Sequence, residues 1–363
     1  MKILNSFFLC LALLTSISCS QEQKTMKSGG EQKTLESTIL FSFKQDHKVG
    51  YIDTTGKIAI KPQFDNASVG FSEGMSEVKM GNKWGYIDKA GKIVIKPQFD
   101  KSGKFSEGLA CVSINNKWGY IDKTGKMVIK PQFDMAWCFS DGIAGVKIGD
   151  KWGYTNKTGK IVIKPQFGVS WVFQEGLAQA KIGDKFGYID KTGKVIINPQ
   201  FDETGSFSQE LAPVRIDQKW GYIDTTGKLV IDTLFDEAGP FIEGFAYDKT
   251  GKVVTNPQLD DTKTGSEGNG LARIKIKDKY GYIDRTGKIV IKPQFDDAGM
   301  LSEGLLNVKI GNKYGYIDRT GKVVINPQFD DAWGFLGGLA RVKMGDKWGY
   351  INKTGKYVWN PTK

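Results

Sequence analysis

An aspartate recurs between an apolar segment and a Thr-Gly pair, and a row of such carboxylates could in principle bind calcium. Asparagine replaces it at two equivalent positions, Asn156 and Asn352. Asparagine keeps the oxygen that accepts a hydrogen bond from a turn backbone, but it lacks the charge that a strong cation ligand or a general acid requires. We therefore expect turn caps rather than a metal or catalytic site at Asp53, Asp88, Asp122, Asp190, Asp224, Asp284 and Asp318.

The other residue types that carry catalysis or bind metals are scarce. The chain has one histidine and four cysteines in 363 residues, and only Cys111 and Cys138 lie far from the N-terminus. Whether these two cysteines pair is left open, because their spacing does not give their separation. We find no phosphate-binding loop, zinc spacing or nucleophile motif, and we expect no enzyme activity, metal or cofactor. Glutamates that precede glycine in turns are interpreted as solvated loop charges: Glu73, Glu107 and Glu175.

Tryptophan occurs in two sets. One set recurs at a fixed position and is interpreted as structural: Trp84, Trp118, Trp152, Trp220 and Trp348. The second set, Trp137, Trp171 and Trp333, occupies a position that is glycine in other repeats, as at Gly103. A buried site accepts glycine and tryptophan in turn only with a void or a clash. We therefore expect an open site there, a candidate platform for a glycan or a protein partner, with local loop packing as the alternative.

The charge is basic, with 51 Lys and Arg against 40 Asp and Glu, a net charge of +11. Basic residues next to aromatic ones are found in nucleic-acid-binding proteins. No run of Lys or Arg concentrates the charge here, and an export signal would separate the chain from cytoplasmic nucleic acid. We expect no nucleic-acid partner and interpret the lysines as protecting sheet edges, with attraction to an anionic surface as the alternative.

These side chains lie on a repeat that fills the chain from about residue 39 to 363. Gly85, Gly119 and Gly153 are 34 residues apart, and a fixed period of this length is typical of repeat proteins. In one unit, residues 109–114 alternate in polarity, 118–122 form a second strand and 127–130 a third, which Pro131 should end. Asn115-Asn116 and the Asp-Lys-Thr-Gly-Lys segment supply the turns. No segment has a helical period.

We therefore predict an all-β tandem array of about ten three-stranded antiparallel meanders with an open or superhelical arrangement. The seventh unit, about residues 245–265, is degenerate. Propeller blades usually have four strands and about 40 or more residues. A closed propeller-like ring is the alternative. We expect a monomer.

The N-terminus has the pattern of an export signal. Residues 1–19 begin with a positive charge, continue through a short apolar run and end in Ser-Ile-Ser-Cys, as in a lipoprotein box, although Ser16 stands where leucine is usual. Residues 20–38 are interpreted as a flexible polar tether. We expect lipidation at Cys19, which would be the only attachment to a membrane. An ordinary secretory signal is the alternative, so the chain is expected in the cell envelope or secreted.

The recurring Lys-Trp-Gly-Tyr-Ile-Asp, as at residues 83–88 and 117–122, the segment Pro-Gln-Phe-Asp and the segment Phe-Ser-Glu-Gly-Leu-Ala resemble the WG, or KWG, repeat family of bacterial proteins. The resemblance covers the chain from about residue 39 onward. It implies β-rich repeats, often in exported proteins, that serve as interaction or scaffold modules without a single activity. We expect an exported, lipid-anchored, non-catalytic scaffold that binds an unknown protein or envelope polymer. A glycan-binding protein that uses exposed tryptophans is the alternative.

Overall fold

The computed structural model describes residues 39–242, 246–247, 253–254 and 270–362. The expected signal peptide, Cys19 and the tether lie outside these residues. All regular secondary structure in the described part is β-strand, and this part contains no helix long and apolar enough to cross a membrane. Among the described residues, residues 71–183 and 187–199 form one compact unit, here unit one, and the remainder forms unit two.

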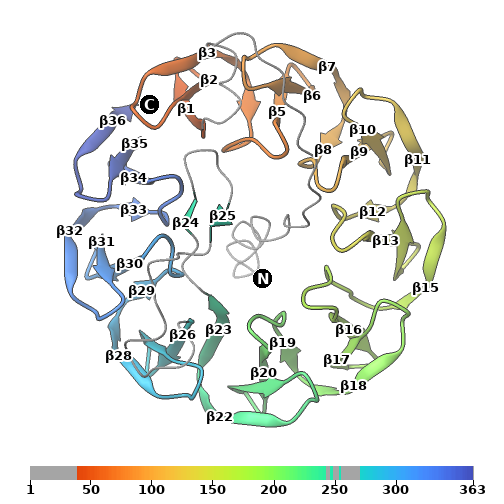
Figure 1. The fold of residues 1–363 in the computed structure, drawn as a ribbon, viewed down its shortest axis with the longest axis vertical. Helices are drawn as coiled ribbons and strands as arrows, with labels where there is room; N and C mark the ends of the chain where they lie inside the picture. The colour runs from red at the N-terminus through yellow and green to blue at the C-terminus, as the bar shows by residue number, and fades with distance from the viewer. Residues whose placement is uncertain (1–38, 243–245, 248–252, 255–269, 363) are drawn as a thin grey trace. The chain divides into compact units, whose positions relative to one another are not determined.

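The repeat folds into modules of three long antiparallel strands, of which nine are present in the described residues (Figure 1). The first strands of the modules are β1 (Phe41–Gln45), β5 (Met75–Met80), β9 (Leu109–Ile114), β13 (Ile143–Ile148), β16 (Ala178–Ile182), β20 (Leu211–Ile216), β26 (Leu271–Ile276), β30 (Leu305–Ile310) and β34 (Leu339–Met344). The second strands are β2 (Lys48–Ile52), β6 (Lys83–Asp88), β10 (Lys117–Asp122), β14 (Lys151–Asn156), β17 (Lys185–Ile189), β21 (Lys219–Asp224), β27 (Lys279–Ile283), β31 (Lys313–Asp318) and β35 (Lys347–Asn352). The third strands are β3 (Ile58–Phe64), β7 (Ile93–Phe99), β11 (Met127–Phe133), β15 (Ile161–Phe167), β18 (Val195–Phe201), β22 (Leu229–Phe235), β28 (Ile289–Phe295), β32 (Val323–Phe329) and β36 (Tyr357–Thr362).

A fourth strand precedes most modules, so the predicted three-stranded meander is wrong. It lies between the third strand of one module and the first strand of the next, and in β12 it consists of two residues that pair with Lys147 and Val146 of β13. Seven sheets have four strands. These additional strands are β4 (Asn66–Ala67), β8 (Lys101–Ser102), β12 (Met135–Ala136), β19 (Glu203–Thr204), β23 (Glu237–Ile242), β29 (Asp297–Ala298) and β33 (Asp331–Ala332).

The third strand continues past its proline, contrary to the prediction that Pro131 ends it. The register between β10 and β11 shifts between Trp118 and Tyr120, which is a β-bulge. The bulged strand then passes very close to Gly119. A Cβ atom added to Gly119 would lie 2.4 Å from the Ile129 carbonyl oxygen and 2.8 Å from the Pro131 nitrogen. The glycine of the Trp-Gly pair is therefore required by close backbone approach.

In the described residues, the degenerate seventh unit contributes no module of three long strands. β23, which precedes the degenerate segment, pairs directly with β26, which follows it. The two strands belong to one four-stranded sheet with β27 and β28. Within that segment, β24 (Ala246–Tyr247) pairs with β25 (Val253–Val254) in a separate two-stranded sheet. The described residues thus form nine modules rather than about ten.

The first and last modules pack together within unit two, so the predicted open array is also wrong. The rings of Phe43 in β1 and Trp359 in β36 lie 4.5 Å apart, and the Tyr350 hydroxyl donates a hydrogen bond of 2.7 Å to the Ser42 carbonyl. Phe41, Phe43 and Leu339 share one apolar core, and Figure 1 shows β1 beside β36. Four-stranded antiparallel modules of this kind are typical of the blades of a β-propeller, the alternative that the sequence analysis left open.

Candidate interaction surface

The recurring aspartates cap turns, as predicted. The Asp122 carboxylate accepts hydrogen bonds from the Thr124 hydroxyl at 2.6 Å and from the backbone N–H groups of Thr124 and Lys126 at 2.9 and 3.0 Å. The hydrogen bond from the Thr124 hydroxyl is the main reason that the pKa of Asp122 lies below its usual value, and the two N–H groups lower this pKa further. Asn156 accepts the same three hydrogen bonds through its amide oxygen.

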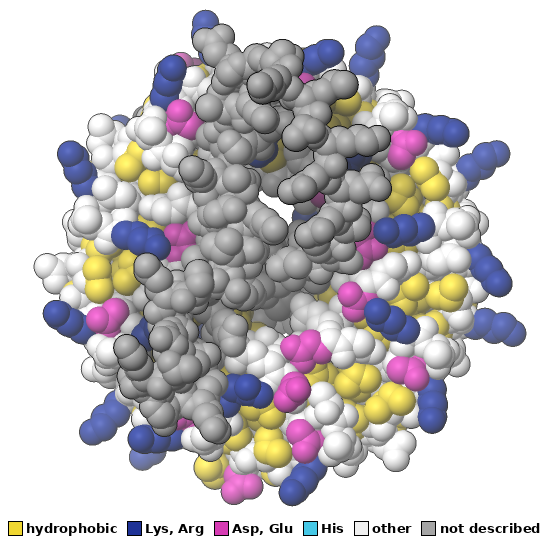
Figure 2. All heavy atoms as spheres, viewed as in Figure 1, with side chains coloured by type: hydrophobic (Ala, Val, Ile, Leu, Met, Phe, Trp, Pro, Cys, Tyr) yellow, Lys and Arg dark blue, Asp and Glu magenta, His cyan; other side chains and the backbone are white. Residues whose placement is uncertain are grey.

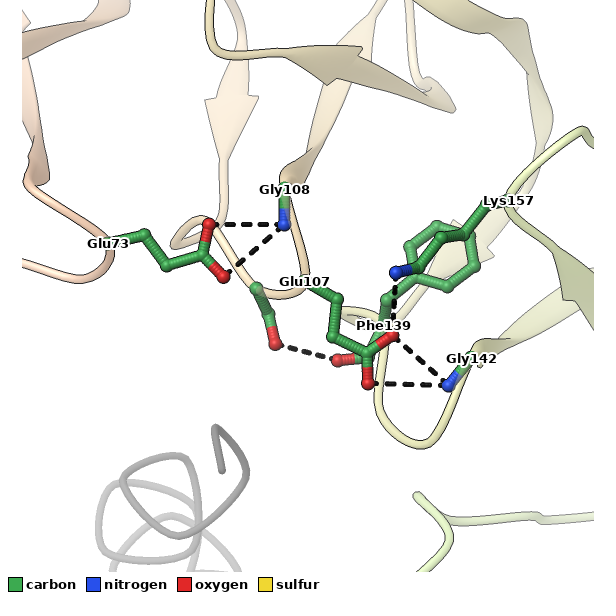
Figure 3. Close-up of polar contacts among 7 residues, drawn as sticks. Glu73, Glu107, Gly108, Phe139, Gly142 and Lys157 are labelled. Carbon is green, nitrogen blue, oxygen red and sulfur yellow. Dashed lines mark hydrogen bonds and ion pairs between the residues drawn. The ribbon is translucent and has the colours of Figure 1, made fainter. Parts of the chain in front are cut away.

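The glutamates of the Ser-Glu-Gly turns link consecutive modules, which corrects their interpretation as solvated charges. The Glu107 carboxylate accepts hydrogen bonds from the Gly142 N–H at 3.1 and 3.3 Å and forms an ion pair of 3.0 Å with Lys157 (Figure 3). Glu73 bonds to the Gly108 N–H in the same way (Figure 3). In the same turn as Glu107, the Ser106 hydroxyl donates a hydrogen bond of 2.8 Å to the Phe139 carbonyl. These carboxylates are therefore engaged in holding the modules together.

A buried tyrosine makes a second link between modules. The Tyr120 hydroxyl donates a hydrogen bond of 2.8 Å to the Trp137 carbonyl in the following module, and its ring packs 4.7 Å from that of Phe139. Burial raises the pKa of Tyr120 far above its usual value. The same bond recurs along the chain between Tyr86 and Gly103, Tyr154 and Trp171, Tyr222 and Gly239, Tyr282 and Gly299, and Tyr316 and Trp333.

The acceptors of these tyrosine bonds are the loop positions where glycine and tryptophan alternate. The backbone at this position is thus fixed in each of these modules, while the side chain changes. The N–H at this position also donates to a carbonyl in the first strand of the same module, from Trp137 to Gly145 at 2.9 Å and from Gly103 to Cys111 at 2.8 Å. The same bond is present at Gly205, Gly299 and Trp333. We call the loop residue and its strand partner the variable pair.

Side-chain size is compensated within several variable pairs. A Cβ atom on Gly145 would lie 2.8 Å from Cδ1 of Trp137, and a Cβ atom on Gly103 would lie 2.5 Å from Sγ of Cys111. In one module the loop residue is Trp137 and its strand partner is glycine. In the preceding module the loop residue is glycine and its strand partner is the larger Cys111. Alternation of glycine and tryptophan does not by itself require an open site, which was the premise of the sequence argument. The predicted role of these tryptophans in binding stays a prediction.

Two of the three predicted platform residues come together in unit one. The Trp137 ring stacks on Trp171 at 6.3 Å and 21°, and on Trp152 at 5.5 Å and 12°. Trp152 is buried, whereas Trp137 and Trp171 are partly buried. This three-ring stack, here the tryptophan stack, combines both tryptophan sets that the sequence analysis kept apart.

The third predicted residue, Trp333, lies in unit two beside a cation. The Arg341 guanidinium is its partner in the variable pair and lies 5.4 Å from the Trp333 ring centroid and 4.3 Å from that of Trp348. A cavity of about 330 Å³ adjoins this cluster and is lined by Ser42, Lys44, Arg341, Asp346 and Trp348, among others. Its walls come from the first and last modules, so local sequence patterns gave no signal for it.

Basic side chains are spread over the visible part of the face shown in Figure 2 rather than concentrated in one patch. On the face shown in Figure 2, Lys and Arg side chains stand singly among acidic, apolar and neutral groups. Several lysines that precede the aromatic residue of the second strand form an ion pair with the aspartate 17 positions later, as Lys83 does with Asp100 and Lys117 with Asp134, both at 2.6 Å. Among the described residues, no group of three or more His, Cys, Asp or Glu side chains is arranged to hold a metal ion.

Solved structures resemble this chain in fold. A eukaryotic initiation factor matches with a TM-score of 0.58 at 11% identity, over 90% of this chain and 98% of that one. The dihydro-haem d1 dehydrogenase NirN matches with a TM-score of 0.47 at 11% identity, over 96% and 77%. AztD from Citrobacter koseri matches with a TM-score of 0.40 at 12% identity, over 90% and 93%. At such identities the likeness to the initiation factor shows the fold alone, a β-propeller.

No curated protein matches the sequence significantly. The family described as "WG containing repeat" matches nine times in succession between residues 50 and 348. Seven of the nine matches run from one second strand to the next, and the matches 220–247 and 246–280 meet at β24 in the degenerate segment. The chain belongs to the WG repeat family.

Proposed function

We propose that this protein is a non-catalytic scaffold that binds protein partners through its variable pairs. The observation that carries the proposal is a contrast within the repeat. The tyrosine bond fixes the backbone of the loop position, yet its side chain is Gly103 in one module and Trp137 in the next. Core and turn positions repeat closely, so the variable pairs are where individual modules acquire distinct surfaces.

The geometry of the tryptophan stack favours a protein partner over a glycan. Sugar rings usually stack their C–H faces on exposed aromatic rings, but the near-parallel rings of Trp137, Trp152 and Trp171 cover part of one another's faces. Protein–protein hot spots are typically formed by rigidly held, partly buried aromatic rings and by arginine. Arg341 occupies the position in its module that Gly145 occupies opposite Trp137. Glycan binding by the tryptophans is the second candidate, supported by the clustering of Trp137 and Trp171.

Quantitative capture tests both candidates. The full chain, a Trp137→Ala/Trp171→Ala variant and a Val128→Ala/Val162→Ala control are compared, because Val128 and Val162 are exposed on third strands. Under the scaffold proposal, specific envelope proteins are retained by the wild type and the control but lost from the tryptophan variant. Equal retention by all three forms would contradict the proposed surface. Loss of polysaccharide retention in the same variant would instead favour the glycan candidate.

We also propose that the chain is exported and anchored at the cell envelope through a lipid on Cys19. Support comes from the signal-like pattern of residues 1–19 and the polar segment that follows. A Cys19→Ala variant should leave the membrane fraction, while a Cys10→Ala control should stay there. Continued fractionation of the Cys19→Ala variant with membranes would contradict the lipid anchor.

A further inference from the structure

Two cysteines from consecutive modules meet beside the tryptophan stack. Sγ of Cys111, in β9, lies 3.8 Å from Sγ of Cys138, in the loop after β12. Both thiols are free. A disulfide requires about 2.05 Å between the sulfurs, so they need to approach by less than 2 Å. Rotation about the Cα–Cβ bonds changes sulfur positions by this amount.

The local packing leaves space for both sulfurs. Gly103 is the partner of Cys111 in its variable pair, and a Cβ atom there would lie 2.5 Å from the Cys111 sulfur and 3.4 Å from the Cys138 sulfur. Gly103 occupies the loop position that Trp137 occupies in the next module. The sulfurs lie together because this position has no side chain.

The two thiols differ in ways that suit sequential exchange. Cys111 is 4% exposed, whereas Cys138 is partly buried. Cys138 donates a weak hydrogen bond to the Lys104 carbonyl at 3.6 Å. The hydrogen bond from Cys111, together with the positive charge of Lys104, lowers the pKa of Cys138, while the same contact and burial raise the pKa of Cys111. Cys138 is thus the more accessible and more nucleophilic thiol.

We propose that Cys111 and Cys138 form a reversible disulfide that joins consecutive modules and fixes the loop carrying Trp137. The oxidant is a small-molecule or protein disulfide. The Cys138 thiolate attacks one sulfur of that disulfide, its S–S bond breaks, and the leaving thiolate takes up the proton that Cys138 released. The Cys111 sulfur then loses its proton and attacks Sγ of Cys138. The second thiolate of the oxidant leaves and takes up that proton, so two protein thiols are oxidised and one disulfide is reduced to two thiols.

Glutathione disulfide is the probe for a test on the full chain, with peptide mapping by mass spectrometry. The wild type should yield linked peptides containing residues 111 and 138, and dithiothreitol should reverse the link. Cys111→Ser should stop at a mixed disulfide with glutathione on Cys138. Cys138→Ser should leave Cys111 largely unmodified while folded, because that sulfur is buried.

Thermal unfolding provides a second readout. A cross-link stabilises the folded chain, so the melting temperature should rise by about 3–6 °C on oxidation of the wild type but not of either serine variant. A stable mixed disulfide on wild-type Cys138 would overturn the proposal. Two cysteines that remain free after prolonged oxidation, or pairing of Cys138 with Cys10 or Cys19, would also overturn it.

Discussion

The bond between the Tyr120 hydroxyl and the Trp137 carbonyl offers a quantitative test of how modules are joined. Tyr120→Phe keeps the ring that packs 4.7 Å from Phe139 but removes the donor of a 2.8 Å hydrogen bond. The tyrosine is fully buried, so water replaces the donor poorly. Leaving a buried carbonyl unpaired costs about 1–3 kcal/mol. The free energy of unfolding should fall by this amount, measured by urea denaturation with tryptophan fluorescence.

A matched control removes an exposed hydroxyl from the same module. Thr124→Ala deletes the donor of the 2.6 Å hydrogen bond to Asp122 at an exposed turn, where water is available. We expect a change within about 0.5 kcal/mol, the usual range for surface substitutions. If Tyr120→Phe costs no more than Thr124→Ala, the buried tyrosine bonds do not hold consecutive modules together, and the argument for a fixed backbone at the variable pairs fails.

Four further predictions concern packing and charge. Gly119→Ala should destabilise the protein by about 3 kcal/mol or more in urea unfolding, because its Cβ atom would meet the backbone of β11; a wild-type value would refute the close approach. Gly145→Cys should destabilise the protein, and adding Trp137→Gly should recover part of the loss because the pair then matches Gly103 and Cys111; additive costs in this double-mutant cycle would refute size compensation. The lowered pKa of Asp122 makes its stabilising contribution present above the unfolded value of about 3.9 and lost as the pH falls through the folded value, so acid titration of stability should be flatter in Asp122→Asn. Burial raises the pKa of Tyr350 to about 12, so stability should be constant below the unfolded tyrosine value of about 10 and decline as the pH rises from there to 12.

The long strands could be predicted because their signals are local. Alternating polarity, the Asn115-Asn116 turn and the Asp122 cap all act within a few residues. The fourth strand was missed because two residues such as Met135 and Ala136 are too short to show alternation. The continuation of β11 through Pro131 was missed because a bulge accommodates the proline.

Contacts between distant residues could not be predicted in the same way. The closing contact joins Tyr350 to Ser42, and nothing local in either segment identifies its partner. The tryptophan stack was partly predictable, since Trp137 and Trp171 occupy equivalent positions in consecutive repeats. The sequence does carry a signal for size compensation. The strand partner lies eight positions after the loop residue, and it is Gly145 where the loop residue is Trp137 but Cys111 where the loop residue is Gly103.

Site-specific photo-crosslinking tests most directly whether the variable pairs bind protein partners. A photoreactive amino acid replaces Trp171 in one form of the full chain, and Val128, which is 42% exposed on a third strand, in a control. The account predicts a discrete protein adduct from position 171 that is absent from position 128. Absence of any adduct at position 171, or the same adduct from both positions, would contradict it.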